Sequence, residues 1–264
     1  SFKDCKSLVK IDIPRSVSSI GDHAYQNCSM LEELTFDPSC TRIEFLAFNG
    51  CANLTLIKVA PTTRAIPSNA FQFFANITHI TIPQTVDTIK NCAFFGLSKL
   101  KEIIIPESVK IIGNSAFSGC KSIQNVILPS SITEIGPSSF ANCISLLSID
   151  IQSHISTIGF NVFSGCSSLQ KIIIPESVET IGIGAFSDCN SLKEILIPSS
   201  VKSIGNKAFY NCSSLIELKI PNSVISIGNS TFQGCTSLKE LEIPSTVNKI
   251  GWSTFDSHIH VRKM

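Results

Sequence analysis

Apolar positions along the chain recur with one fixed period of 23 residues. Each period carries an aromatic residue, and the positions three, six, nine and eleven residues after it are apolar as well. The unit reads F-x-x-C-x-S-L-x-x-I-x-I-P-x-S-V-x-x-I-G-x-x-A. A fixed period of this length indicates a stack of similar turns, a solenoid. The twelve aromatic positions follow without insertion or deletion: Phe2, Tyr25, Phe48, Phe71, Phe94, Phe117, Phe140, Phe163, Phe186, Phe209, Phe232 and Phe255.

Each unit predicts two extended segments and one tighter turn. Residues 169–174 alternate in the manner of a half-buried strand, which Pro175 ends because it lacks a backbone donor. Residues 178–181 predict a second, shorter extended segment, and residues 185–189 predict one helical or 3-10 turn. One unit cannot bury its apolar side alone, so stability must come from stacking. We expect a right-handed curved stack with a parallel β-sheet of the longer strands on its concave face.

The unbroken period predicts a single solenoid domain over residues 1–264, with eleven full periods and a partial terminal repeat. The chain opens inside a unit without a polar cap, so we expect it to be a fragment of a longer protein. The net charge is +1 and no basic stripe is visible, which predicts no nucleic-acid partner. No stretch approaches the roughly 18 consecutive apolar residues of a membrane span.

The cysteines predict packing rather than disulfides. Nine of the eleven occupy the position three after the aromatic, where other repeats carry Phe74 or Leu97. A position that exchanges Cys for Phe or Leu is a core position, where Cys acts as a small hydrophobe. We therefore expect free, buried thiols, with Cys92 the most exposed and Cys40 placed at the Val position. No Cys/His cluster has metal-ligand spacing, so neither a metal nor another cofactor is predicted.

Candidate functional residues lie at the outward positions of the longer strand. Those eight and ten after the aromatic alternate with the core positions, and the middle of the chain gives an apolar stripe rimmed by charge, which is typical of a protein-binding patch. Two alternatives remain: outward Ile reflects strand propensity alone, or another part of the protein covers this face. The candidates are Ile104, Ile127, Asp150, Ile173 and Leu196, flanked by Glu102, Lys171 and Glu194. Phe73 and Phe95, extra aromatics on neighbouring repeats, form a secondary candidate.

Catalytic chemistry is not predicted. An active site needs a nucleophile or an acid–base group beside a partner in a pocket, and the five histidines fall at unrelated positions of the repeat. His258 and His260 form an H-x-H pair that could hold a metal weakly, although a polar terminal strand explains them better. We therefore expect no enzymatic activity, no catalytic residue and no small-molecule substrate.

The motif L-x-x-I-x-I-P-x-S-V-x-x-I-G-x-x-A-F-x-x-C resembles the BspA-like, or treponemal-type, leucine-rich repeats over the whole chain. The resemblance implies a leucine-rich-repeat solenoid from the surface or secreted proteins of host-associated bacteria and anaerobic protists. It also implies adhesion to host matrix proteins, to host cells or between cells. We therefore expect a non-enzymatic protein-binding scaffold whose partner lies on the concave face.

An alternative is an intracellular structural or assembly component that uses the solenoid as a spacer or clamp in the cytoplasm. The unpaired thiols favour this alternative, because secreted proteins tend to oxidise theirs.

Overall fold

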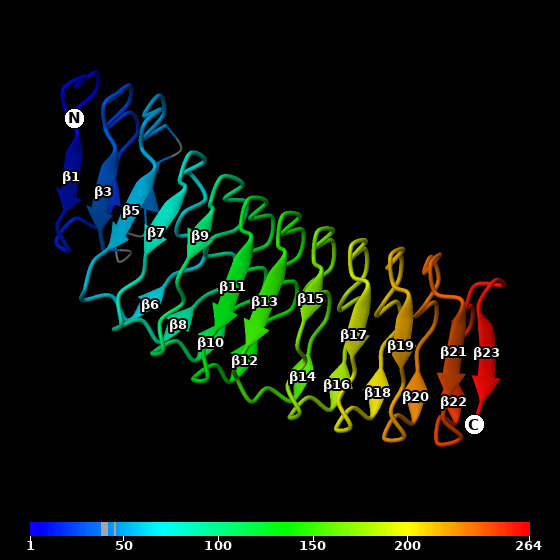
Figure 1. Ribbon diagram of the computed structural model, residues 1–264. Helices are drawn as coiled ribbons and strands as arrows, with labels where there is room; N and C mark the ends of the chain where they lie inside the picture. The colour runs from blue at the N-terminus through cyan, green and yellow to red at the C-terminus, as the bar shows by residue number, and fades with distance from the viewer. Residues whose placement is uncertain (38–41, 45) are drawn as a thin grey trace.

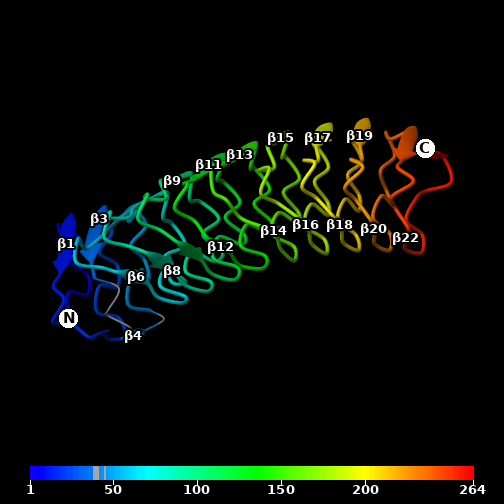
Figure 2. The ribbon, with the colours of Figure 1, turned by 90° about the horizontal axis from the view of Figure 1, so that it is seen from below.

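The computed structural model describes residues 1–37, 42–44 and 46–264, which form a stack of parallel turns. The two termini lie at opposite ends of the stack (Figure 1). Cys40, which the sequence places at a core position, lies outside the described residues. Seen from below, the body is arched, with the longer strands along the upper edge of the view and the shorter strands along the lower edge (Figure 2).

The longer strands are parallel, and neighbouring strands pair with a register of one repeat. Ile11 lies opposite Leu34, and Leu34 opposite Ile57, so each apolar position continues across the sheet. The longer strands are β1 (Lys10–Ile13), β3 (Glu33–Phe36), β5 (Leu56–Val59), β7 (His79–Thr81), β9 (Glu102–Ile103), β11 (Asn125–Leu128), β13 (Ser148–Ile151), β15 (Lys171–Ile172), β17 (Glu194–Leu196), β19 (Glu217–Lys219), β21 (Glu240–Ile243) and β23 (His260–Lys263).

The shorter strands form a second parallel series. Each contributes an inward isoleucine, such as Ile181, which is fully buried. They are β2 (Ser19–Ile20), β4 (Arg42–Ile43), β6 (Ala65–Ile66), β8 (Thr88–Ile89), β10 (Ile111–Ile112), β12 (Glu134–Ile135), β14 (Thr157–Ile158), β16 (Thr180–Ile181), β18 (Ser203–Ile204), β20 (Ser226–Ile227) and β22 (Lys249–Ile250).

The aromatic residues stack in two runs, from Phe2 to Phe48 and from Phe71 to Phe255, and the tilted ring of Phe74 contacts both runs. The rings of Phe94 and Phe117 lie 4.9 Å apart between centroids and are parallel within 5°. Phe117 and Phe163 are fully buried. Phe74 is buried too, and packs 5.1 Å from Phe48, so its place at the Cys position is a packing role. Every repeat thus depends on both neighbours for its largest apolar contact.

The turn around the aromatic is not helical, and here the sequence prediction was wrong. We call the residues from two before to three after the aromatic the Phe turn. In one repeat, Ser115 and Gly119 flank Phe117 with φ angles of 52° and 75°. Left-handed residues on both sides interrupt a right-handed helix, and no helix occurs in the described part of the chain. The freed amides bond to the next repeat instead, with Phe117 N donating to Ser139 O at 2.7 Å.

The sheet of longer strands is interrupted, whereas the adjacent shorter strands stay paired. The longer strands pair from β1 to β9 and again from β11 to β15, but among the described residues no strand pairing joins β9 to β11. In the same repeats β8, β10 and β12 remain paired. Between these two repeats the stack therefore opens on the side of the longer strands only. The longer strands are also interrupted between β15 and β17, which a single bridge from Ile173 to Leu196 connects, and between β19 and β21. The described shorter strands are interrupted between β12 and β14.

Candidate partner-binding face

Four apolar side chains of the central repeats project into solvent, each within a longer strand or directly after it. Ile104 is 80% exposed, Ile127 58%, Ile173 60% and Leu196 71%. We call the outward side of β9, β11, β13, β15 and β17 the long-strand face. The alternation that turns these residues outward also buries the ones beside them, because successive strand residues point to opposite sides. The described residues of the chain leave these four side chains uncovered.

These side chains and Asp150 stand one per repeat in a column with a carboxylate in its middle, which strand pairing among the described residues supports from Ile127 onward but not between Ile104 and Ile127. Ile127 pairs with Asp150, and Ile173 pairs with Leu196. Asp150 is exposed, and its Oδ2 accepts a hydrogen bond from Gln152 Nε2 at 2.9 Å. Gln152 takes the position where most repeats carry proline, so this central repeat differs from its neighbours at two outward positions.

The flanking residues Glu102, Lys171 and Glu194 are also exposed, on β9, β15 and β17. They lie beside the column, two residues before its members along each strand. The longer strands nearer the N-terminus are different, because their charges pair with one another. Glu33 bonds to Lys10 at 2.6 Å and to Lys58 at 2.9 Å. These hydrogen bonds, from Lys10 first and then Lys58, hold the pKa of the Glu33 carboxyl below its usual value.

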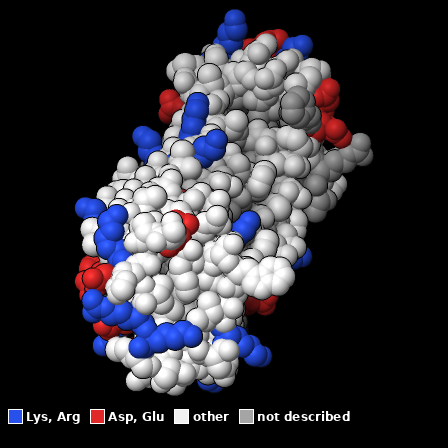
Figure 3. Space-filling model, turned by 90° about the vertical axis from the view of Figure 1, so that its right-hand side faces the viewer, with Lys and Arg blue, Asp and Glu red and all other residues white. Residues whose placement is uncertain are grey.

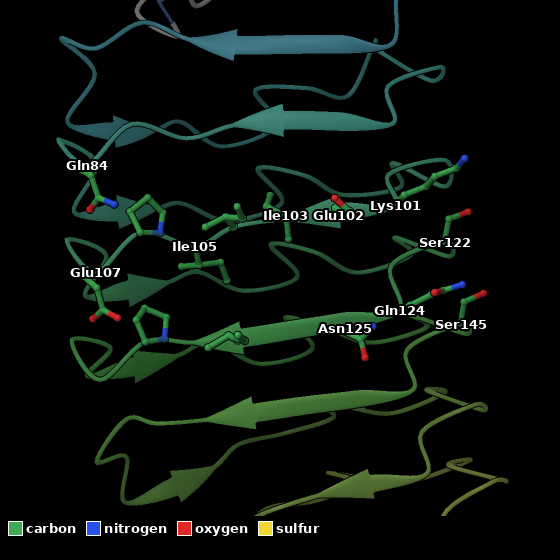
Figure 4. Close-up of a pocket in the computed structure, with 14 residues that line it drawn as sticks. Gln84, Lys101, Glu102, Ile103, Ile105, Glu107, Ser122, Gln124, Asn125 and Ser145 are labelled. Atoms are coloured by element: carbon green, nitrogen blue, oxygen red, sulfur yellow. The ribbon is translucent and has the colours of Figure 1, made fainter.

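A groove of about 830 Å³ lies where β9 and β11 separate, and its lining includes Ile104 and Ile127. Figure 4 shows Gln84 and Glu107 towards one end of it and Lys101, Ser122, Gln124 and Ser145 towards the other. Sequence reasoning missed this groove, because the repeat pattern continues unchanged through the opening.

The middle of the molecule carries few charges. Residues 103–170 contain five charged residues in 68 positions, whereas the whole chain has 21 basic and 20 acidic residues in 264. In the view from the C-terminal side, charged side chains stand as separate groups between wide uncharged areas (Figure 3). Low charge density is a feature of interface cores, and Ile104, Ile127 and Asp150 fall in this stretch, whereas Ile173 and Leu196 follow it.

The secondary candidate lies elsewhere. Phe95 is 52% exposed and Phe73 is half-buried, and both belong to Phe turns. The structure does not bring them to the long-strand face. Other exposed aromatics, Phe160 and Trp252, follow the shorter strands. Scattered exposed aromatics are normal on soluble proteins and need no functional explanation.

The cysteines that the structure describes are free thiols, and Cys92 is half-buried. The sequence did not predict that eight of them donate a hydrogen bond to the backbone carbonyl of the aromatic residue in the preceding repeat. These are Cys28, Cys51, Cys120, Cys143, Cys166, Cys189, Cys212 and Cys235, at Sγ to O distances of 3.1 to 3.2 Å. Burial raises the pKa of the Cys143 thiol to about 12, so these thiols stay protonated near neutral pH.

The described residues contain no group of three or more His, Cys, Asp and Glu side chains that could hold a metal ion. His258 Nε2 lies 3.2 Å from the carbonyl oxygen of Cys235, which ties this ring to the preceding repeat. Within the described part of the chain, no helix has the length and apolarity that crossing a membrane requires.

This fold, a stack of parallel strands with one apolar column per repeat position, is that of a leucine-rich-repeat solenoid. The BspA type leucine-rich repeat region matches the chain in six copies, over residues 1–101, 64–175, 87–215 and 157–264. The chain belongs to the BspA type leucine-rich repeat family.

Solved structures share this architecture. A leucine-rich repeat protein from Bacteroides ovatus aligns with a TM-score of 0.56 and 22% identity, over 97% of this chain and 92% of that one. The T. pallidum leucine-rich repeat protein gives a TM-score of 0.52 and 25% identity, over 70% and 78%. The pneumococcal vaccine antigen PcpA gives 0.50 and 20%, over 97% and 68%. No curated protein matches the sequence.

Proposed function

We propose that this chain is a non-enzymatic scaffold that binds a protein partner on the long-strand face, in the manner of a surface adhesion module. The column of Ile104, Ile127, Ile173 and Leu196 carries this proposal. Burying an apolar side chain of this size contributes roughly 1.5 to 3 kcal/mol. Four of them supply the scale of free energy needed to offset the cost of association, roughly 4 to 15 kcal/mol.

We propose a cell-surface or secreted location. The family resemblance supports it, and the thiols do not count against it. Eight of them are buried hydrogen-bond donors, and burial raises the pKa of Cys143 and Cys235 to about 12. The thiolate is the form that oxidises, so an oxidising environment leaves these thiols intact. These eight buried cysteines therefore do not favour an intracellular spacer over a surface module.

The test is binding of the chain to extracellular-matrix proteins and to intact epithelial cells. The variant Ile127→Glu with Ile173→Glu places two charges in the column without touching the core. A matched control, Ile183→Glu with Ile225→Glu, alters two exposed isoleucines outside the long-strand face, 47% and 50% exposed. Both variants are expected to fold with an unchanged melting temperature, and only the first is expected to lose binding.

Equal binding by the two variants would overturn the assignment to the long-strand face. A wild-type chain that binds neither the matrix proteins nor the cells would overturn the adhesion role.

A further inference from the structure

We infer that the partner segment on the long-strand face is an amphipathic α-helix lying along the axis of the stack, with a Lys or Arg near its middle that meets Asp150. This inference rests on the proposed function, whose partner it narrows to one structural class. Three observations support it: the spacing of the column, the position of its single carboxylate, and the groove between β9 and β11.

The spacing of the column matches a helix. Paired strands lie about 4.8 Å apart, and the Phe rings of the same repeats are 4.9 to 5.9 Å apart. An α-helix has a pitch of about 5.4 Å, so it presents one side chain per turn at nearly this interval. From Ile127 to Leu196 the column covers three intervals, roughly 15 Å, which corresponds to about 10 helical residues, and Ile104 lies across the opening between β9 and β11.

An extended partner does not fit this column as well. Along a β-strand, side chains on one side recur every 6.6 Å or so. Laid along the stack, such a strand would lose register with the repeats after two of them. A helix keeps register over the four repeats from Ile127 to Leu196, with contacts at positions i+4, i+7, i+11 and i+14, and its residue i lies over the opening beside Ile104.

The charge pattern specifies a cation in the partner. Asp150 lies in the middle of the column and is exposed. A partner that covered it with apolar atoms alone would leave a buried, unpaired carboxylate, which is costly. Around it, the positions seven to thirteen after the aromatic in these five repeats carry five acidic and three basic residues: Glu102, Glu107, Asp150, Glu176 and Glu194, against Lys101, Lys171 and Lys193.

A second copy of this chain is a poorer occupant. Two copies packed face to face and antiparallel about the centre of the column would bring Asp150 against its own counterpart. Like charges placed opposite each other at an interface cost several kcal/mol. The face therefore favours a partner of opposite charge pattern over itself.

The groove between β9 and β11 determines which end of the proposed helix carries its bulkiest apolar residue. It lies at one end of the column, and both Ile104 and Ile127 line it. Interface energy concentrates where a large side chain fills a pocket. The turn of the helix over β9 and β11 therefore carries the bulkiest apolar residue, and the turn over β17 carries a smaller one.

The test uses three labelled synthetic peptides and fluorescence anisotropy. The first is a helix with a tryptophan at i, leucines at i+4, i+11 and i+14, and a lysine at i+7. The second replaces that lysine by glutamate, and the third places two prolines in the middle to prevent helix formation. We expect the wild-type chain to bind the lysine peptide at least about tenfold more tightly than the glutamate peptide, and the proline peptide not at all.

The variant Asp150→Lys is expected to reverse the preference between the lysine and glutamate peptides. Glu134→Lys is the matched control, because it makes the same change of charge at an exposed position of β12, away from the face. It should keep the wild-type preference. Equal binding of the helical and proline peptides would overturn the inference, as would an Asp150→Lys variant that keeps the wild-type preference.

The two proposals fail in different ways. If no peptide binds while Ile127→Glu with Ile173→Glu abolishes binding to matrix or cells, the helical partner is wrong and the scaffold stands. If the wild-type chain prefers the lysine peptide and Asp150→Lys reverses this preference, while neither matrix proteins nor cells are bound, the adhesion role is wrong and helix recognition stands.

Discussion

The thiol of Cys143 donates a hydrogen bond to the backbone carbonyl oxygen of Phe117, in the preceding repeat, at 3.2 Å. The same carbonyl accepts the backbone amide of Cys120 at 3.1 Å. One oxygen therefore closes the turn of its own repeat and ties that repeat to the next. This explains why a small residue with a donor recurs at this position of the repeat.

Replacing Cys143 by alanine removes the donor and leaves a small cavity. We expect the free energy of unfolding to fall by about 1 to 2 kcal/mol, the sum of a weak hydrogen bond and lost packing. Urea denaturation under reducing conditions measures it. Cys92→Ala, at a half-buried position, should change the value by less than about 0.5 kcal/mol. Equal effects of the two substitutions would contradict a structural role for the thiol bond.

Alkaline pH should destabilise the fold through these thiols. Burial raises the pKa of Cys143 and Cys235 to about 12 and that of Cys51 to about 11, from the ordinary thiol value of 9.0. Below pH 9 the thiols are protonated in both the folded and the unfolded chain, so their stabilising contribution is complete. Above it the unfolded chain loses protons first, and the free energy of unfolding falls by up to about 1.4 kcal/mol per pH unit for each such thiol.

Urea denaturation between pH 8 and pH 11 tests this dependence. A variant with both Cys143→Ala and Cys235→Ala should show a shallower decline than the wild-type chain. If the two declines have the same slope, the buried thiols are not its source.

Replacing one of the stacked aromatic residues by alanine should reduce stability most in the interior of the stack. Phe163 is fully buried, and its ring stacks on Phe140 at 5.9 Å and on Phe186 at 5.6 Å. Phe163→Ala is expected to cost on the order of 3 to 5 kcal/mol. Phe2 is 52% exposed and, within the described part of the chain, stacks only on Tyr25, at 5.3 Å, so Phe2→Ala should cost well under half as much. Similar losses in chemical denaturation would show that the repeats do not depend on two-sided stacking.

Alanine substitution should have opposite effects on stability at two glycines that occupy the same position of the repeat. A Cβ on Gly205 would lie 2.7 Å from the carbonyl carbon of Gly182 and the amide nitrogen of Ile183, in the preceding repeat. Gly205→Ala therefore forces neighbouring repeats apart and should cost roughly 1 to 3 kcal/mol. A Cβ on Gly21 meets nothing within 4 Å, so Gly21→Ala should be neutral or stabilising by up to about 1 kcal/mol. Thermal melts of both variants settle the comparison.

The parts of this fold that the sequence predicts are those governed by the period. Because Lys10 and Glu33 are one repeat apart, strand register and the alternation of buried and exposed residues follow from the spacing. The buried cysteine positions follow in the same way, since Leu97 and Phe74 share them.

The parts that escaped prediction depend on backbone geometry. Polar residues such as Ser115, and even Lys207, adopt a left-handed φ in the Phe turn. These residue types do not indicate that the turn is non-helical, because backbone hydrogen bonds to the next repeat impose the left-handed conformation. No feature of the sequence indicates the separation of β9 from β11 either, because Ile104 and Ile127 fit the pattern of ordinary strand residues.

The amides of the Phe turn that bond outside their own repeat donate to the next repeat, as Phe209 does to Thr231 and Phe232 to Thr254. Amides that follow the shorter strands point the other way along the stack, as Gly205 does to Ile181 and Gly228 to Ile204. Each Phe turn therefore presents partial positive charge to the repeat that follows it. In the Phe232 turn, Gly234 N bonds to the side-chain carboxylate of Asp256 at 2.8 Å, whereas Gly165 and Gly119 use backbone carbonyls. That turn is thus closed by a full negative charge, which complements the partial positive charge of its N–H groups.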